Sequence, residues 1–577
     1  MSGSTTTHEA TPTQVVASCF FAFRFSLLIG VIACGMVLSA IDAGDDCFWS
    51  APGPGITFDE GLNTEGGVYF VEMGLQSGIG IVHPGTWYDI FNHPSYHPDY
   101  PPLGRLPGAV SNALLSRLAP AEGRPLYSVS YARVGTAIVF GLLAALVTFS
   151  TQRLCGPIAG LFAGLSLIFM PRVFGHAHLA SVETMMNLTY AACVFGIVLL
   201  LGHRDQLRAK DGIWPGVLLG LALLTKIQAI FLPPLLTVWI LWNWRKNGIS
   251  TLLVLALTSF AVFLLGWPWL WSDPFSRFFQ YFAQTTDRVT LYCYYFGQRY
   301  ADKAVPWHYP FVMFAVTTPI VTLALGMNGL IFRQEPADKR EPAPLVPLNG
   351  RGRQLLAGAI VLPLVVFAIP GVAVYDGERL FLVVWPIFAL FVGIGAQRLY
   401  ESARLRSGAL VAGILTAVAI LGEPGYSLLR IQPCYLSYYS PLIGGLSGAV
   451  KLGLEPTYWG DSLTPRFLQE MNDKLPKGAV VGVAPVLHPL YLESLKKDSP
   501  LRLRPDLQIV AFDDKQPQAP QYVFWVRRLG DPWDSLLNRD AETEMIGEVS
   551  RSGVPLAELL YRSTPWTAAN AVNPPQN

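Results

Sequence analysis

Charged side chains are scarce in this chain of 577 residues, because Lys, Arg, Asp and Glu together make up only 14% of it. A soluble domain carries about 25%. Apolar residues make up 51% of the chain, and the formal net charge is only +1. The low share of charged residues and the high share of apolar ones exclude an ordinary soluble domain and indicate a protein that crosses a membrane several times. The balanced charge gives no reason to expect a nucleic acid as partner.

Cysteine is also sparse. The seven cysteines are scattered along the chain without a C-x-x-C pair, so the sequence predicts neither a disulfide framework nor a zinc site made of cysteines. Residues 1–17 contain no Lys or Arg, and the apolar stretch 18–41 is longer than the core of a signal peptide. We therefore expect 1–17 to be a cytoplasmic tail and 18–41 to be the first membrane span.

Long apolar segments recur over the first three quarters of the chain. A membrane-spanning helix needs roughly 20 predominantly apolar residues. Segments that approach this length are 18–41, 131–151, 157–175, 183–202, 213–226, 228–244, 250–271, 308–331, 355–374, 379–398 and 407–423. The sequence therefore predicts a polytopic α-helical membrane protein with about eleven transmembrane helices.

Positive charges in the short loops predict how these helices are oriented, since cytoplasmic loops carry an excess of Lys and Arg. With a cytoplasmic N-terminus, the inner loops contain the basic residues at 153, 204–210, 245–246, 333–353 and 398–406. The outer side then receives the long loop 42–130 and the turns 176–183 and 375–378. Within the long loop, 102–120 is amphipathic, and we expect it to lie at the membrane interface as a helix.

The last quarter of the chain is polar. Short β-type runs at 479–487, 507–512 and 521–526 alternate with helical stretches such as 464–475, a pattern that predicts a small α/β domain. An odd number of spans places this domain outside the cytoplasm. We expect 18–423 to be the transmembrane domain and 424–577 to be the extracytoplasmic α/β domain.

Ionisable residues stand at the expected outer ends of several spans. Asp59 and Glu60 follow the first span, Glu183 opens a later one, and Lys226 and Arg379 lie at the ends of two others. Ionisable residues at membrane depth are costly and usually mark the path of a substrate or ion. Acids and cations gathered on one side suit an anionic lipid phosphate and a nucleophile that needs a base.

Each of these residues also has a plain structural interpretation. Asp59, Glu60 and Glu183 could favour helix N-termini, Lys226 could extend its amine to the interface, and Arg379 could be an interfacial anchor. Their shared location on the outer side favours a functional interpretation over any of these.

Five short motifs follow one another in an order that is typical of one family. They are F-D-E at 58–60, H-P-D-Y-P-P-L-G-R at 97–105, S-V-E-T-M-M-N at 181–187, G-L-A-L-L-T-K at 220–226 and E-R-L-F-L-V-V-W-P at 378–386. With them the chain resembles the GT-C glycosyltransferases of family 39, which include the protein O-mannosyltransferases and the lipid A aminoarabinose transferase. Glu183 departs from the family pattern, which usually has Asp there. Two later strings, at 436–445 and 457–463, look like those of uncharacterised bacterial members.

The resemblance implies a GT-C fold and a glycosyltransferase of the plasma membrane. Its donor would be a polyprenyl-phosphate-linked sugar, and its acceptor would be a glycan, lipid or protein on the outer face. Asp59 would be the general base of a displacement that inverts the anomeric carbon, and Glu60 would position Asp59 or the acceptor. Lys226, Arg379 and Arg105 would bind the donor phosphate.

The resemblance also implies secondary roles. His97 and Glu378 would position the donor or the acceptor. Some family members use a divalent metal, and Asp59, Glu183 and His178 could share a Mg or Mn ion.

The main alternative is a transporter or flippase of a lipid-linked saccharide. It would predict inverted repeats and acids deep within the spans. The sequence shows no internal repeat, and its acids stand in loops beside the spans.

Overall fold

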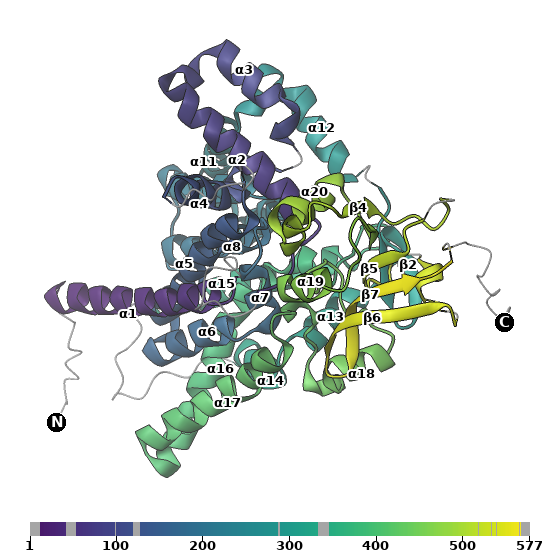
Figure 1. The fold of residues 1–577 in the computed structure, drawn as a ribbon. Coiled ribbons are helices and arrows are strands. Elements are labelled where there is room, and N and C mark those ends of the chain that lie inside the picture. Colours follow the sequence, from purple (N-terminus) through teal and green to yellow (C-terminus); the bar gives the residue numbers. More distant parts are fainter. Residues whose placement is uncertain are drawn as a thin grey trace, which may run out of the picture.

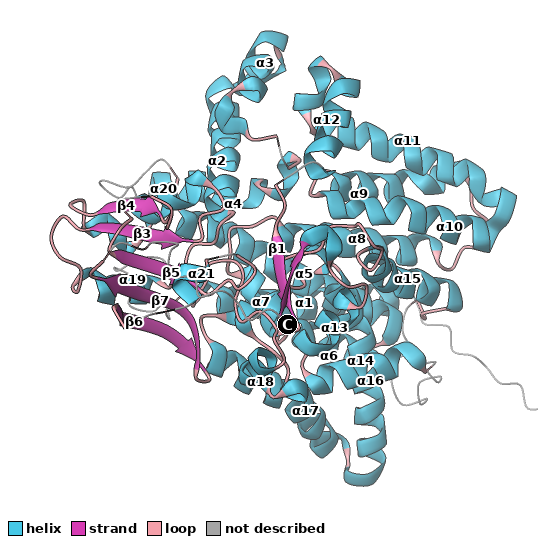
Figure 2. Ribbon diagram, turned by 90° about the vertical axis from the view of Figure 1, so that its right-hand side faces the viewer, coloured by secondary structure: helices cyan, strands magenta, loops and turns pink. Residues whose placement is uncertain are grey.

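The computed structural model describes residues 12–41, 53–98, 100–118, 127–286, 289–332, 346–516, 519–531, 533–537, 539, 541–564 and 566. Helices dominate the described part, and a small sheet lies at one side of them (Figures 1 and 2). Some of the predicted tail 1–17 lies outside the described residues, but the first helix already begins at Pro12, within that tail.

Helices occupy every one of the eleven apolar segments. In chain order they are α1 (Pro12–Leu38), α5 (Val129–Cys155), α6 (Pro157–Ile168), α7 (Pro171–Ala177), α8 (Glu183–Leu201), α9 (Ile213–Leu223), α10 (Leu232–Trp244), α11 (Ile249–Gly266), α13 (Tyr309–Thr317), α14 (Ile320–Ile331), α15 (Gly350–Val366), α16 (Val384–Ser407) and α17 (Ala409–Ile431). The last of these continues to Ile431, beyond the expected domain boundary at 423.

Fewer helices have spanning length than the eleven apolar segments suggest. Within the described residues four helical segments are long and apolar enough to cross a membrane, or up to six if each of two bent pairs counts as one span. The bent pairs are α6–α7 and α13–α14, with angles of 69° and 117°. The structure thus agrees with a polytopic helical membrane protein in which several apolar segments are short or broken.

The long loop after α1 is largely helical. It contains α2 (Glu60–Ser77), α3 (Pro84–Asn92) and α4 (Leu106–Leu118), and α4 confirms the helix expected within 102–120. At Gly135 of α5, an added Cβ would lie only 2.1 Å from the carbonyl oxygen of Pro107, so glycine is what lets α4 approach α5. Figure 1 shows α3 and α12 (Pro274–Thr286) together at the top of the molecule, beyond the main helices.

The polar last quarter forms a five-stranded mixed sheet in the order β4-β3-β5-β7-β6. Strand β3 (Val480–Ala484) pairs in parallel with β4 (Gln508–Ala511) and β5 (Tyr522–Val526), which confirms the three predicted strands. The antiparallel hairpin β6 (Thr543–Arg551) and β7 (Val554–Arg562) was not expected. Helix α19 (Pro465–Asn472) matches the predicted helical stretch.

This sheet region is packed against the long loop rather than separate from it. The ring of Tyr491, in α20 (Pro489–Asp498), meets the ring of Phe58 edge to face at 4.9 Å. Nearby, a Cβ added at Gly61 would lie 2.9 Å from the carbonyl oxygen of Leu490. The start of α2 is therefore held between the helices and the sheet region.

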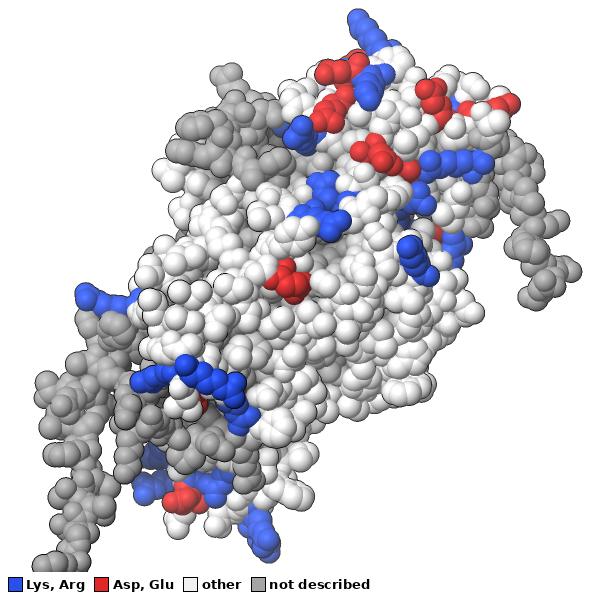
Figure 3. Space-filling view, turned by 90° about the horizontal axis from the view of Figure 1, so that it is seen from below, with Lys and Arg blue, Asp and Glu red and all other residues white. Residues whose placement is uncertain are grey.

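The surface seen from below carries its charges unevenly (Figure 3). Lys, Arg, Asp and Glu gather towards opposite ends of this face, and a broad band between them carries few of them. Such a band is what lipid tails would contact.

Candidate active site

Asp59 stands at the start of α2, yet its side chain does not cap that helix. Its backbone occupies the N-cap position, with no hydrogen bond from the helix to the carboxylate. Instead, Oδ2 lies 2.8 Å from Nη2 of Arg379. The Asp59 side chain is 28% exposed while that of Arg379 is only 5% exposed. Asp59 is thus a partly accessible carboxylate at the edge of a buried ionic cluster.

Glu60 points the other way and is fully buried. Both of its oxygens pair with the guanidinium of Arg133, with Nε–Oε1 and Nη2–Oε2 distances of 2.8 Å. They also accept hydrogen bonds from the backbone N–H groups of Ala180 and Thr57. A carboxylate with four donors has little capacity left for a substrate. Of the two roles expected for Glu60, this geometry favours positioning Asp59 over contacting an acceptor.

Arg379 forms ion pairs with three carboxylates. Besides Asp59, its Nε lies 3.1 Å from Oε1 of Glu183, and its Nη1 lies 3.1 Å from Oδ2 of Asp376. The guanidinium also lies over the ring of Trp459, 4.4 Å from its centroid. An interfacial anchor would leave its charged group in the headgroup region, so this burial contradicts the anchor interpretation.

Glu183 joins the two predicted cations. Its Oε1 lies 2.7 Å from Nζ of Lys226 as well as 3.1 Å from Nε of Arg379, so the two nitrogens are no more than about 6 Å apart. Lys226 is only 3% exposed and does not reach out to the surface. Because an ammonium group has three donors and this contact uses one, Lys226 keeps capacity for a further anion.

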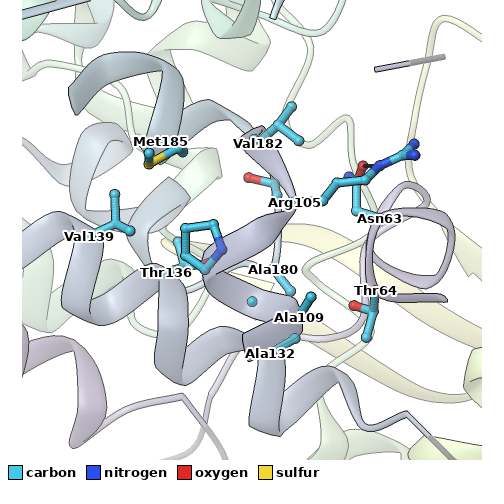
Figure 4. A pocket seen from close by; sticks show the side chains of 14 residues that line it. Asn63, Thr64, Arg105, Ala109, Ala132, Thr136, Val139, Ala180, Val182 and Met185 are labelled. Atoms are coloured by element: carbon cyan, nitrogen blue, oxygen red, sulfur yellow. Dashed lines mark hydrogen bonds between the residues drawn. The ribbon is translucent and has the colours of Figure 1, made fainter. Parts of the chain in front are cut away.

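Arg105 lies close by. Its guanidinium donates to Oδ1 of Asn63 and to the backbone oxygen of His97. The ring of Tyr100 lies 5.2 Å from the Arg105 guanidinium and 5.6 Å from the Lys226 amine, which links the two cations. Figure 4 shows Arg105 beside Asn63 at the edge of a small cavity of about 20 Å³.

The two predicted positioning residues hold different cations of the site. The imidazole of His97 lies 4.0 Å from Glu65, and its backbone oxygen holds Arg105. Glu378 is fully buried and pairs with Arg172, while its other oxygen lies 3.4 Å from the hydroxyl of Tyr458. Glu378 therefore fixes the backbone just before Arg379.

The predicted metal ligands do not come together. His178 is buried between the rings of Phe174 and Tyr435, and its Nδ1 lies 2.7 Å from the backbone oxygen of Phe174. Asp59 and Glu183 both hold the Arg379 guanidinium, whose positive charge opposes a cation there. Within the described residues, no group of three His, Cys, Asp or Glu side chains could hold a metal ion. Asp59 and Glu183 contact the same guanidinium while His178 contacts Phe174 and Tyr435, so the described residues give no support to a Mg or Mn ion shared by all three.

Sequence reasoning missed the residues that support Arg379. Oδ1 of Asp376 lies 2.5 Å from Nη1 of Arg528, which follows β5, and the same Nη1 donates to the backbone oxygen of Tyr458. Asp376 has a φ of 57°, a left-handed conformation that is uncommon for residues other than glycine. It stands two residues before the motif that begins at Glu378, in the string Y-D-G-E-R. No sequence signal pointed to Arg528, which lies 152 residues away.

Part of the chain is similar to a known protein family. The model of the dolichyl-phosphate-mannose-protein mannosyltransferase family matches residues 128–269, which include Arg133, Glu183 and Lys226. Among curated proteins, no sequence matches the chain significantly.

Several solved structures are similar to this chain at low sequence identity. Apo ArnT from Cupriavidus metallidurans is 16% identical, over 94% of this chain and 98% of that one, with a TM-score of 0.47. ArnT from the same organism, bound to undecaprenyl phosphate, is 15% identical over 95% of this chain and 98% of that one, with a TM-score of 0.44. The oligosaccharyltransferase AglB from Archaeoglobus fulgidus was solved in complex with an inhibitory peptide and a dolichol-phosphate. It is 11% identical over 88% of this chain and 69% of that one, with a TM-score of 0.44.

The family match covers two of the five motifs, and the other three lie outside it. Over residues 128–269 this chain is thus similar to the dolichyl-phosphate-mannose-protein mannosyltransferase family, the kind of family that its motifs resemble.

Proposed function

We propose that the protein moves a sugar from a polyprenyl-phosphate donor to an acceptor on the outer face of the plasma membrane. The observation that carries this proposal is the shared contact of Lys226 and Arg379 with one oxygen of Glu183, beside the partly exposed carboxylate of Asp59. The matching family is itself named for a dolichyl-phosphate sugar, which supports this class of donor.

In this proposal the donor phosphate binds between Lys226 and Arg379, and Arg105 adds a third positive charge nearby. A guanidinium matches phosphate oxygens in pairs, and an ammonium adds a point charge. Because the three side chains are buried, their attraction for a phosphate is stronger than it would be in water. The same cations stabilise the negative charge that grows on the phosphate as it leaves.

The chemical step is a single displacement. The acceptor hydroxyl gives its proton to Oδ1 of Asp59, which makes no hydrogen bond with the described residues, while its oxygen forms a bond to the anomeric carbon. The bond between that carbon and the phosphate oxygen breaks, and its electron pair leaves with the polyprenyl phosphate. One displacement inverts the anomeric carbon. Glu60 takes part by holding the start of α2 in place.

The membrane arrangement is part of the same proposal. About eleven spans in a GT-C fold, a cytoplasmic N-terminus and an extracytoplasmic region after 423 put Asp59, Lys226 and Arg379 on the outer side. The packing of α20 against the start of α2 supports placing the sheet region on that side.

The phosphate site is tested by donor binding. Lys226→Met should weaken binding of undecaprenyl phosphate by tenfold or more in detergent-purified protein, because it removes one of two adjacent cations. Lys451→Met, at an exposed position in α18 (Gly445–Lys451), is the matched control and should bind as the wild type does. Equal binding by both variants would contradict the site. Movement of a lipid-linked saccharide across vesicles without sugar transfer would favour the transporter alternative.

A further inference from the structure

A second and larger cavity lies outside the ionic cluster. It measures about 240 Å³ and lies beside the Ile431 end of α17. A single water needs only about 10–15 Å³ by the same kind of measure, so this space admits a small polar group. Its walls come from α17, the segment 438–447 and the tip of the β6–β7 hairpin at Ser552. The proposed sugar transfer does not use it.

Glu423 brings an incompletely used carboxylate to this cavity. Its Oε1 accepts hydrogen bonds from the hydroxyls of Ser427 and Tyr438, each at 3.0 Å. Its Oε2 is shielded from solvent and has no hydrogen-bond partner in the described structure. An unsatisfied, shielded carboxylate oxygen is costly. A charged N–H donor that draws this carboxylate towards the cavity, which Glu423 lines, would relieve that cost.

Arg430 supplies the opposite charge on the same side of α17. Glu423, Ser427 and Arg430 stand at helical spacings of four and three residues and all line the cavity. The Arg430 side chain is exposed and makes no ion pair with the described residues. A ligand that carries both an ammonium and a phosphate would match this acid and base together.

The surface of α17 below the cavity is apolar. Exposed Val411, Leu415 and Val418 follow one another along the helix towards exposed Tyr426 at the cavity. Because α17 has the length and composition of a membrane span, hydrocarbon chains can lie along these residues. Figure 1 places α17 at the bottom of the molecule, and the face seen from below has a band with few charged residues (Figure 3).

We propose that this cavity binds the headgroup of a phospholipid with a primary amine. The ammonium donates to Oε2 of Glu423, the phosphate pairs with Arg430, and the acyl chains lie along α17. Tyr438 and Tyr439 line the cavity, and Arg172, which pairs with Glu378, donates to the backbone oxygen of Tyr438 and lies over the ring of Tyr439. A lipid bound in the cavity would therefore pack against the two tyrosines that contact Arg172, the partner of Glu378.

The test measures lipid binding by native mass spectrometry of purified protein. We expect phosphatidylethanolamine to bind the wild type at least tenfold more tightly than phosphatidylcholine, whose methylated ammonium has no N–H donor, or phosphatidylglycerol, which has no amine. Glu423→Gln should abolish this preference, and Arg430→Gln, at an exposed position, should weaken binding severalfold. Glu401→Gln, on neighbouring α16, is the matched control and should keep the preference.

Three results would overturn the proposal. They are equal binding of the three phospholipids, an unchanged preference in both Glu423→Gln and Arg430→Gln, and equally tight binding of water-soluble glycerophosphoethanolamine, which would show that no lipid is required. Because the readout is binding and not sugar transfer, this proposal and the proposed enzyme activity can fail independently of each other.

Discussion

Mutation of Asp59 should lower the rate of sugar transfer, whereas mutation of the adjacent Glu60 should lower the stability of the fold. Glu60→Gln removes the charge that compensates the buried guanidinium of Arg133, which is only 2% exposed. Breaking a buried ion pair by removing one partner costs about 3–5 kcal/mol. The amide group of Gln would also face N–H donors where the carboxylate accepts four hydrogen bonds.

Helix α2 contains a matched control. Glu72 also makes two hydrogen bonds to one guanidinium, that of Arg117, at 2.9 and 2.8 Å. In that pair the side chains are 28% and 53% exposed, and exposed ion pairs contribute only about 0–1 kcal/mol. Glu72→Gln should therefore change stability little, although the pair geometry is nearly the same.

The assay is unfolding of the purified protein in detergent, followed as the free energy of unfolding in a denaturant series. Combining Glu60→Gln with Arg133→Met should lose less stability than the two single changes added together, because the double variant leaves no uncompensated charge. A loss for Glu60→Gln no larger than that for Glu72→Gln would refute the anchoring role of Glu60.

Two further predictions concern the sheet region. Arg528→Gln should lower the rate of sugar transfer more than it weakens donor binding. Without the ion pair to Arg528, Asp376 can move, and Arg379, which it contacts, can move with it. Steady-state kinetics with purified donor should show a lower kcat with little change in KM. Burial raises the pKa of Asp461 and of Glu455 to about 7, so the folded protein holds these protons more tightly than the unfolded chain does. Their contribution to stability should be complete below about pH 4 and be lost as the pH rises through 7, at roughly 1.4 kcal/mol per pH unit and group. A series of unfolding measurements from pH 5 to 8 with Asp461→Asn as comparison will test this slope.

Much of the fold could be predicted because it depends on local patterns. Apolar length located the membrane-type helices, and short β-type runs located strands β3, β4 and β5. What length could not show is where a helix breaks: the bend between α13 and α14 falls at Pro319, which disfavours a helical conformation of the residue before it.

The sequence predicted the main residues of the site but not the residues that hold them in place. The charge pattern of the loops placed Asp59, Glu183, Lys226 and Arg379 on one side of the spans, and the structure brings their side chains into contact. The side of α2 on which Glu60 points could not be read from the sequence, nor could its partner Arg133. Arg528 reaches Asp376 only through folding of the sheet region, and no local pattern encodes that contact.

The central claim is that Asp59 is the base of a sugar transfer from a lipid phosphate, and the most direct test is transfer by Asp59→Asn. Membranes that contain the variant are supplied with a radiolabelled polyprenyl-phosphate sugar, and label in the acceptor fraction is counted. Asp89→Asn, at an exposed position in α3, is the control. The account predicts that Asp59→Asn lowers transfer by at least a hundredfold, a loss typical of removing a general base, with the variant still folded. Transfer by Asp59→Asn at the rate of the wild type and of Asp89→Asn would contradict it.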